Sequence, residues 1–438
     1  MKSTSEATST KVANYLIAAI LMIAPFHGFL TVWGASLVGH YTLLRAWSAV
    51  LLLILAGCAV VWSLRSKATR QWLVRDRLVR MVVLFALLTV LWTVVPLLTG
   101  KVSLGAACLG IFQDLRFWLF FLLVSLVARR SNWLLQHWQQ IVLGPALVVA
   151  AFAVLQLTVL PDDFLKHFGY SAATIESYET INNDDAYPRF ASTLRGANPL
   201  GAYLVVITGL LAAFYARRWR GAYWEILAAL TAGALLASFS RSAWIGAAVA
   251  VFVVIITRSM RAKKTKQLWL ASLGILFLTG LTFTAFHSNP HVQNALFHTS
   301  DNSKVEVSSN DQRSSALSTA ALDVLDHPLG GGVGSAGPAS VHNTHGETKL
   351  AENYILQIGQ EMGWVGLILF VSLLVMVWRR LWQRRNNPLA LACLAALLGL
   401  AVVNLLSHAW ADDTLAYVFW GLTAIALSSA KEKQSHED

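Results

Sequence analysis

The chain has 438 residues, of which 56% are apolar and only 13% are charged, and its formal net charge is +11. A soluble domain carries about 25% charged residues, so this composition excludes an ordinary soluble protein and is typical of a chain solvated mostly by lipid. Lys and Arg recur in short runs between apolar stretches instead of forming one surface, which argues against nucleic acid as a partner.

Twelve apolar runs are each long enough to cross about 30 Å of hydrocarbon as a helix. Their predicted bounds are 14–34, 43–63, 79–99, 104–127, 140–160, 197–216, 221–238, 242–258, 268–286, 353–378, 388–408 and 412–430. No small-residue cleavage site follows the first run, which we interpret as a retained span and not a removed signal peptide. We therefore predict an all-α integral membrane protein of about 12 transmembrane helices, folded as one polytopic domain over residues 1–438.

The basic residues predict the orientation. Most of the 34 Lys and Arg residues lie in alternate connections between the predicted spans and at both ends of the chain. Because cytoplasmic connections are enriched in these residues, we expect both termini to be cytoplasmic. Two long polar connections, 161–196 and 287–352, then lie on the outer face, where loops of this length are usually functional or disordered. Apolar residues at helical spacing predict a short surface helix within 300–326.

Two segments place an arginine at the outer start of a span that runs inward. Arg195 precedes span six, where Asn198 is suited to cap the helix and Pro199 to occupy its first position. Arg241 stands at the turn into span eight. Helix N-termini bind anions, and guanidinium groups form bidentate hydrogen bonds to phosphate oxygens. The pair predicts a clamp for a diphosphate whose lipid tail stays in the bilayer. The alternative is that each arginine reaches lipid headgroups or pairs with an acidic residue of the first outer loop.

A third segment opens span ten and carries candidate proton acceptors. His342, His345 and Glu352 can each accept a hydroxyl proton near the membrane surface. The alternative is that Glu352 only complements the start of the helix and that the histidines are solvated loop residues.

Three charged residues lie inside predicted spans. Glu361 needs a partner or a proton, because an unpaired carboxylate within a membrane is costly. Asp114 and Arg116 are interpreted as structural and facing other helices. The cysteines (Cys58, Cys108 and Cys393) show no metal-ligand spacing and are interpreted as small buried apolar side chains. We expect no metal and no cofactor.

These residues resemble a known family. Arg195, Ser240–Trp244, the glycine-rich turn 330–334, Glu352–Gln357 and Glu361–Gly366 are similar in order and spacing to the O-antigen ligase and O-antigen polymerase superfamily. The similarity covers residues 190–380 strongly and the earlier spans by topology alone.

The resemblance implies a metal-independent membrane glycosyltransferase of cell-envelope polysaccharide biosynthesis. Such enzymes take a glycan from an undecaprenyl-diphosphate carrier on the periplasmic face of the bacterial inner membrane. A ligase passes it to a hydroxyl of the lipid A core of lipopolysaccharide, and a polymerase passes it to another carrier-linked glycan. Carried over by position, Arg195 and Arg241 would bind the donor diphosphate, with Arg189 as a third candidate.

One position departs from the family pattern. Ligases of this family place a histidine directly before the Asn that opens the late span, and here that position is Glu352. A His-Asn pair occurs ten residues earlier, at His342 and Asn343. The catalytic base is therefore Glu352 or His342, and we favour Glu352 because a helix start fixes its position. The departure also weakens the assignment of lipid A core as the acceptor.

A secondary transporter is the main alternative outside the enzyme class. It predicts charges near the bilayer midplane and Gly/Pro-broken spans in corresponding halves of the chain, for which Pro25, Asp114 and Arg116 give little support. The long outer loops and interfacial arginines favour an enzyme. We predict an O-antigen ligase-like transferase, with a polymerase of lipid-linked repeat units as the alternative.

Overall fold

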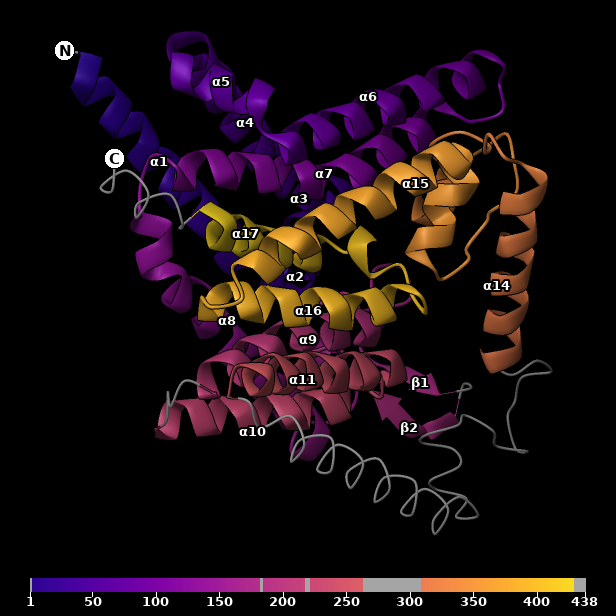
Figure 1. The fold of residues 1–438 in the computed structure, drawn as a ribbon. Coiled ribbons are helices and arrows are strands. Elements are labelled where there is room, and N and C mark those ends of the chain that lie inside the picture. The colour runs from indigo at the N-terminus through magenta and orange to yellow at the C-terminus, as the bar shows by residue number, and fades with distance from the viewer. Residues whose placement is uncertain (1, 182–183, 217–220, 263–308, 429–438) are drawn as a thin grey trace.

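The computed structural model describes residues 2–181, 184–216, 221–262 and 309–428 (Figure 1). The predicted span 268–286 and the first part of the second long connection lie outside these residues. With η marking a short 3-10 helix, the elements in chain order are α1 (Lys2–Ile23), η1 (Ala24–Phe26), α2 (His27–Val38), α3 (Tyr41–Arg45), α4 (Trp47–Arg65), α5 (Lys67–Arg75), α6 (Arg77–Leu98), α7 (Leu104–Ala128), α8 (Trp133–Thr158), η2 (Phe164–Phe168), β1 (Glu179–Ile181), β2 (Asp184–Arg189), α9 (Ala197–Tyr215), α10 (Ala222–Ala237), α11 (Arg241–Ala262), α14 (Ser309–Asp326), η4 (Gly337–His342), α15 (Tyr354–Gln383), α16 (Pro388–Asn404), η5 (Ala409–Ala411) and α17 (Asp413–Ser428).

The helical, membrane-spanning character predicted from the sequence is confirmed. Within the described ranges, eight helical segments are long and apolar enough to cross a membrane. Three further apolar helices, α10, α16 and α17, have 16 or 17 residues. Eleven of the twelve predicted spans thus correspond to a helix, and the twelfth is the one outside the described residues. The described part of the predicted surface helix within 300–326 is α14.

The helices differ in how deeply they are buried. α16 packs against α9, α11, α15 and α17. In α9, 78% of the residues in its apolar stretch are buried inside the bundle. In α4 and α6 the buried share is 22%. Leucines such as Leu53 and Leu87 are therefore exposed on the outside of the bundle. Such surfaces are costly in water and compatible with lipid.

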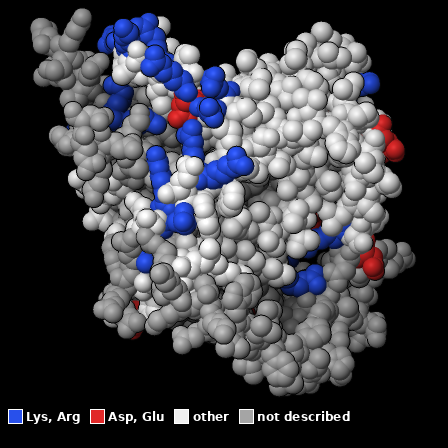
Figure 2. Space-filling view, viewed as in Figure 1, with Lys and Arg blue, Asp and Glu red and all other residues white. Residues whose placement is uncertain are grey.

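The two ends of the bundle carry different elements. In Figure 1 the β1–β2 hairpin and α14 lie at the right end, and α5 and the beginning of α1 lie at the left. Figure 2 shows Lys and Arg side chains gathered over the left part of the same face, which holds α5, the start of α6 and the end of α15. This separation is the pattern on which the predicted orientation rests, and which end faces the cytoplasm stays a prediction.

The first long connection folds into a small sheet instead of an extended loop. Strands β1 and β2 pair antiparallel, with Glu179 opposite Arg189 and Thr180 opposite Pro188. The register shifts after Thr180, so that Ile181 pairs with Asp184.

The glycine-rich turn packs into a break in α15. Gly363 has a φ of 62°, which interrupts the helix there. The N–H groups of Gly331 and Gly332 donate to the carbonyls of Gln360 and Glu361 at 2.7 and 2.9 Å. A side chain at Gly363 would collide with the Pro328 carbonyl. The turn therefore satisfies backbone groups that the break exposes, as a membrane interior requires.

The charges predicted to lie inside spans are buried. The Glu361 carboxylate accepts from the Gly334 N–H at 2.9 Å and lies beside Asp114, which accepts from the Tyr354 hydroxyl at 2.9 Å. Two neighbouring buried carboxyl groups repel unless one holds a proton. The interpretation of all three cysteines as buried is wrong for Cys108, which is exposed, because its face of α7 is not covered.

Candidate functional site

A cavity of about 650 Å³ opens at the end of the bundle that carries α14. Arg195, His342 and Glu352, which the sequence singled out separately, all line it. The other residues on its wall are Tyr41, Arg45, Leu109, Gln113, Thr174, Ile175, Asn198, Pro199, Pro338, Val341, Ser407, His408, Ala409, Ala411 and Asp412. The structure thus brings a predicted diphosphate ligand and both predicted bases into one space.

A second cavity of about 340 Å³ lies next to the first, and Asn198 lines both. Arg189 and Arg241 line this second cavity. The rest of its wall is formed by Thr180, Ile181, Phe239, Ser242, Ile245, Arg313 and Leu406. The predicted arginines are therefore divided between two neighbouring cavities that share Asn198.

The segment that carries Arg195 is fixed by backbone contacts. Ser192 Oγ donates to the Val149 carbonyl at 2.7 Å, and Thr193 Oγ1 donates to the Pro25 carbonyl at 2.8 Å. Ser192 has a φ of 53°, a conformation that costs about 1–3 kcal/mol for a residue other than glycine. Within the part of the chain that the structure describes, the Arg195 side chain itself has no hydrogen-bond or ion-pair partner.

The prediction that Asn198 caps α9 is wrong. Gly196 is the N-cap residue, and the Ala197 N–H donates to Glu179 Oε1 at 3.1 Å. Asn198 Oδ1 instead accepts from Arg189 Nη2 at 2.8 Å. The carboxylate of β1 thus already occupies the anion-binding start of α9, since the register of the hairpin brings Glu179 there.

Arg189 is committed to internal contacts. Its side chain is 12% exposed and pairs with the Glu179 carboxylate at 3.3 Å. Arg189 Nε also donates to the Ser238 carbonyl at 3.2 Å. Burial lowers the pKa of Arg189, and the Glu179 carboxylate opposes that shift. Arg189 is therefore paired with an acidic residue of the first outer loop. This is the alternative that the sequence left open for Arg195 and Arg241.

Arg241 is the first residue of α11, as its sequence position predicts. The preceding turn is held by Trp244 Nε1, which donates to the Leu235 carbonyl at 2.6 Å, and Phe239 has a φ of 44°. Arg189 and Arg313 lie within electrostatic range of Arg241. Three guanidinium groups therefore line the second cavity, and two of them are paired with carboxylates, Arg189 with Glu179 and Arg313 with Glu352.

Glu352 directly precedes the N-cap residue of α15 but does not cap the helix. Asn353 caps that helix by accepting from the Leu356 N–H at 3.0 Å. Glu352 has a φ of 48°, and its carboxylate accepts from Arg313 Nε at 2.5 Å. The sequence predicted a helix around Arg313 but gave no reason to select this residue, because its partner lies 39 positions away.

His342 lies exposed at the end of η4. Its carbonyl accepts from Ser103 Oγ at 2.9 Å, and Asn343 Oδ1 accepts from the Ser103 N–H at 2.9 Å. These contacts anchor the loop to the start of α7. His345 does not line this cavity.

His408 is a cavity residue that sequence reasoning did not select. It lies in the turn between α16 and η5, half-buried on the same wall as Glu352. Burial lowers the pKa of His408, and the Glu352 carboxylate partly opposes that shift. The available signal was a short polar stretch, with His408, Asp412 and Asp413, between two apolar runs.

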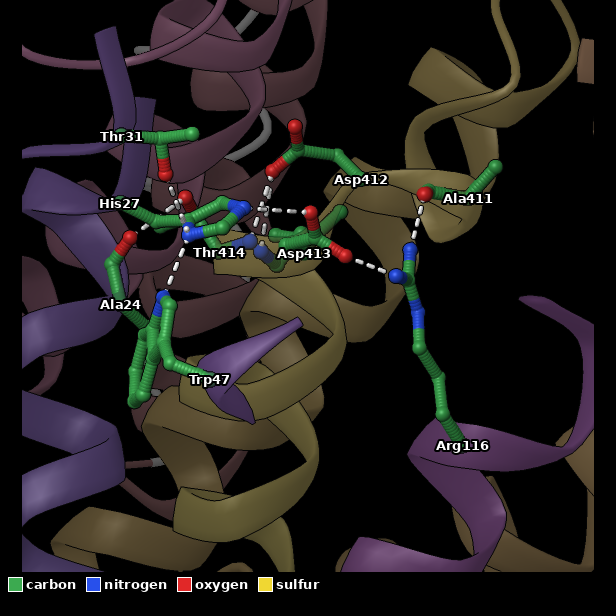
Figure 3. Close-up of polar contacts among 10 residues, drawn as sticks. Ala24, His27, Thr31, Trp47, Arg116, Ala411, Asp412, Asp413 and Thr414 are labelled. Atoms are coloured by element: carbon green, nitrogen blue, oxygen red, sulfur yellow. Dashed lines mark hydrogen bonds and ion pairs between the residues drawn. The ribbon is translucent and has the colours of Figure 1, made fainter. Parts of the chain in front are cut away.

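A buried ionic network lies next to the cavity-lining residues Ala411 and Asp412 (Figure 3). Arg116 on α7 pairs with Asp413 and donates to the Ala411 carbonyl. His27 Nε2 lies 3.1 Å from the other Asp413 oxygen, and Trp47 Nε1 donates to His27 Nδ1 at 2.6 Å. Because the indole can only donate, His27 carries its proton on Nε2, toward Asp413. The structural role predicted for Arg116 agrees with this placement.

The same network fixes the beginning of α17. Asp412 Oδ1 accepts from the Thr414 N–H at 2.9 Å, and Thr414 Oγ1 donates to the Ala24 carbonyl at 3.1 Å. Asp412 also lines the large cavity (Figure 3). Within the described ranges, no group of three or more His, Cys, Asp or Glu side chains is arranged to hold a metal ion.

Comparison with known proteins identifies a family. The family described as O-Antigen ligase matches residues 226–371. This range includes Arg241, Arg313, His342 and Glu352, and it ends before His408. No curated protein matches the chain in sequence. The family match confirms the resemblance to the O-antigen ligase and polymerase superfamily and indicates a membrane glycan-processing enzyme.

Proposed function

We propose that this chain, a member of the O-antigen ligase and polymerase superfamily, moves a glycan from an undecaprenyl-diphosphate carrier to an acceptor hydroxyl on the outer face of the inner membrane. The observation that carries the proposal is the large cavity. It combines Arg195, a cation without a partner in the described residues, with Glu352 and His342.

The donor diphosphate binds where the two cavities meet. Arg195 contacts it from the first cavity and Arg241 from the second, on either side of Asn198. Guanidinium groups bind phosphate oxygens through charge-assisted hydrogen bonds and stabilise the charge that develops as the diphosphate leaves. These cations supply the positive charge, so we propose that transfer needs no metal. Arg189 holds Asn198 in place and is the weakest of the three predicted ligands.

The acceptor enters on the side of Glu352 and His342. Its hydroxyl oxygen attacks the anomeric carbon of the donor sugar, and the bond from that carbon to the diphosphate oxygen breaks. The electron pair leaves with the diphosphate, and the hydroxyl proton passes to a base on the cavity wall. Glu352 and His342 both lie on that wall, and the Glu352 carboxylate is held by Arg313 at 2.5 Å.

The decisive experiment measures glycan transfer by purified variants in proteoliposomes loaded with the lipid-linked glycan. Arg195→Ala and Arg241→Ala are expected to insert and fold normally and to lose about 100-fold or more of the transfer rate. Lys166→Ala is the matched control, since within the described residues this exposed cation at the same end pairs with Asp163 alone. Near-normal transfer by either arginine variant would contradict the diphosphate clamp.

Ligase and polymerase are separated by glycan profiling of a deletion strain. We expect full-length lipid-linked polymer to accumulate, which is the result for a ligase. Accumulation of single lipid-linked repeat units would instead identify a polymerase.

A further inference from the structure

We propose that His408 is the base that removes the acceptor hydroxyl proton, with the Glu352 carboxylate stabilising the protonated imidazole electrostatically. This inference rests on the proposed function and names a residue outside the family match. His408 lines the cavity together with Arg195 and Glu352.

The first argument is the state of the candidate bases. Glu352 is bound to Arg313 at 2.5 Å, so one of its oxygens already accepts a charge-assisted hydrogen bond. His342 is exposed at the end of a 3-10 helix. His408 is half-buried, and within the described chain neither of its ring nitrogens has a hydrogen-bond partner. Burial keeps its pKa below the ordinary value, so at neutral pH the imidazole is uncharged and able to accept a proton.

The second argument is rigidity, because a base must be held close to its productive position. Asn404 Oδ1 accepts from the Trp410 N–H at 3.0 Å, and Asn353 Nδ2 donates to the Leu405 carbonyl at 2.9 Å. Arg116 holds the Ala411 carbonyl (Figure 3). The turn carrying His408 is thus fixed on both sides. Asn353, the residue directly after Glu352, connects this turn to the start of α15.

The third argument is electrostatic. In the transfer step, an unprotonated ring nitrogen of His408 takes the hydroxyl proton as the glycosidic bond forms and the diphosphate leaves. The imidazolium produced lies within electrostatic range of Glu352 and Asp412, which stabilise it. It then returns the proton to water. The charged and titratable groups around His408 are Glu352, Asp412, Arg195 and Arg313, with His342, Tyr41 and Arg45 on the same cavity wall.

The test uses the full-length protein in proteoliposomes. His408→Ala is expected to lower transfer about 100-fold or more with donor binding unchanged, and added imidazole is expected to restore part of the rate. His408→Gln, which keeps a polar side chain, should lose transfer equally without a change in the thermal unfolding midpoint. His167→Ala is the matched control, since this exposed histidine lies at the same end in η2.

A pH profile separates a base from a merely structural residue. Wild-type transfer should fall as pH drops through the pKa of His408. Glu352→Gln removes the carboxylate that raises this pKa, so the acid limb should move to lower pH. Wild-type transfer combined with near-normal rates of both His408 variants overturns the His408 assignment alone. Absence of transfer by the wild type overturns the proposed function.

A separate cavity at the opposite end supports an independent inference. A groove of about 730 Å³ lies between the start of α6 and the end of α15. Arg77, Arg80, Arg379 and Arg380 line it, and Met81, Leu84, Met376 and Gln383 complete its wall. Asp76 engages Arg380 at 2.6 Å, whereas the other three arginines have no partner within the described residues.

We infer that this groove binds an anionic phospholipid from the adjacent leaflet. Three unpartnered cations suit its phosphate, and the methionine and leucine side chains suit the start of its acyl chains. Basic pockets between transmembrane helices recognise acidic headgroups in this way. A free anion would use the arginines but would leave the apolar wall uncovered.

The test is thermal unfolding in detergent with added lipid. Phosphatidylglycerol is expected to raise the midpoint by about 2 °C or more, and phosphatidylcholine and inorganic phosphate are expected to have no effect. Arg80→Gln combined with Arg379→Gln should abolish the shift. Arg65→Gln combined with Arg70→Gln, two exposed arginines outside the groove, should retain it. An equal shift with phosphatidylcholine or phosphate, or a full shift in the groove variant, overturns the inference.

Discussion

The wall of the large cavity and the buried ionic network around Asp413 use the same residue types to different effect. In the network, Arg116, His27 and Asp413 satisfy one another, and the network ties α2, α7 and α17 together (Figure 3). On the wall, Arg195 and His408 have no hydrogen-bond partner among the described residues. A buried charge that is paired holds elements in place, whereas an unpaired one beside a cavity is available to a ligand.

The comparison also explains why charge alone did not separate structure from function in the sequence. Arg116, Arg189 and Arg195 are each flanked by apolar residues. Arg116 is paired with Asp413 from a distant helix, and Arg189 is paired with Glu179 on the neighbouring strand. Substitutions should therefore divide into those that unfold the protein and those that stop transfer.

The largest effect is expected from Asp413→Ala. Removing this carboxylate leaves Arg116 buried without its counter-ion, which costs about 3–5 kcal/mol of unfolding free energy. Thermal unfolding in detergent measures the loss. Asp163→Ala is the control, because its exposed pair with Lys166 contributes no more than about 1 kcal/mol. Equal midpoints for the two variants would show that the network does not stabilise the fold.

Arg116→Lys is expected to have the next largest effect. A lysine keeps the charge but cannot bridge the Asp413 carboxylate and the Ala411 carbonyl together, so the cost should be about 2–3 kcal/mol. The unfolding midpoint should fall, and any loss of transfer should follow the loss of folded protein. If the variant is normally stable but transfers no glycan, Arg116 takes part in transfer and its role is not only structural.

Arg195→Lys makes the same substitution on the cavity wall. We expect an unchanged unfolding midpoint, because Arg195 has no partner in the described residues to lose. Transfer should fall about tenfold, since a lysine replaces bidentate contacts to phosphate with a single donor. The transfer rate and the unfolding midpoint are measured on one preparation of Arg195→Lys. If this variant is destabilised as much as Arg116→Lys, the proposed difference between the cavity wall and the buried network is contradicted.

The smallest effect is expected at Asp323 on α14, which forms a partly exposed ion pair with Lys349. Burial would raise the pKa of this carboxyl, but the hydrogen bonds from Lys349 and Gln360 outweigh it and hold the pKa below the ordinary value. A carboxyl with a depressed pKa stabilises the fold above its unfolded pKa, and this contribution is lost as pH falls below about 4.

Protease cleavage within α14 should therefore increase as pH drops from about 5 to about 3. Asp323→Asn is expected to remove that pH dependence, and Asp326→Asn, an exposed neighbour on α14, to preserve it. Persistence of the full pH dependence in Asp323→Asn would assign it to another group.

Much of the architecture could be predicted from the sequence because its determinants are local. Apolar runs of span length predicted eleven of the described helices, and the position of Arg241 predicted the start of α11. The cap of α9 could not be predicted in the same way. Asn198 is suited to cap a helix, but the Glu179 carboxylate from the hairpin took that role at 3.1 Å. A long-range contact thus overrode a local preference.

Hydropathy and motif spacing, which are carried by neighbouring positions, predicted a helical membrane protein and singled out Arg195, Arg241, His342 and Glu352 as candidate site residues. Only the tertiary structure decided that Arg189 is internally paired, that Arg313 holds Glu352, and that His408 shares their cavity. The physical reason is that pairing and burial depend on which distant segments meet. A side chain is available for chemistry only when none of those segments has already satisfied it.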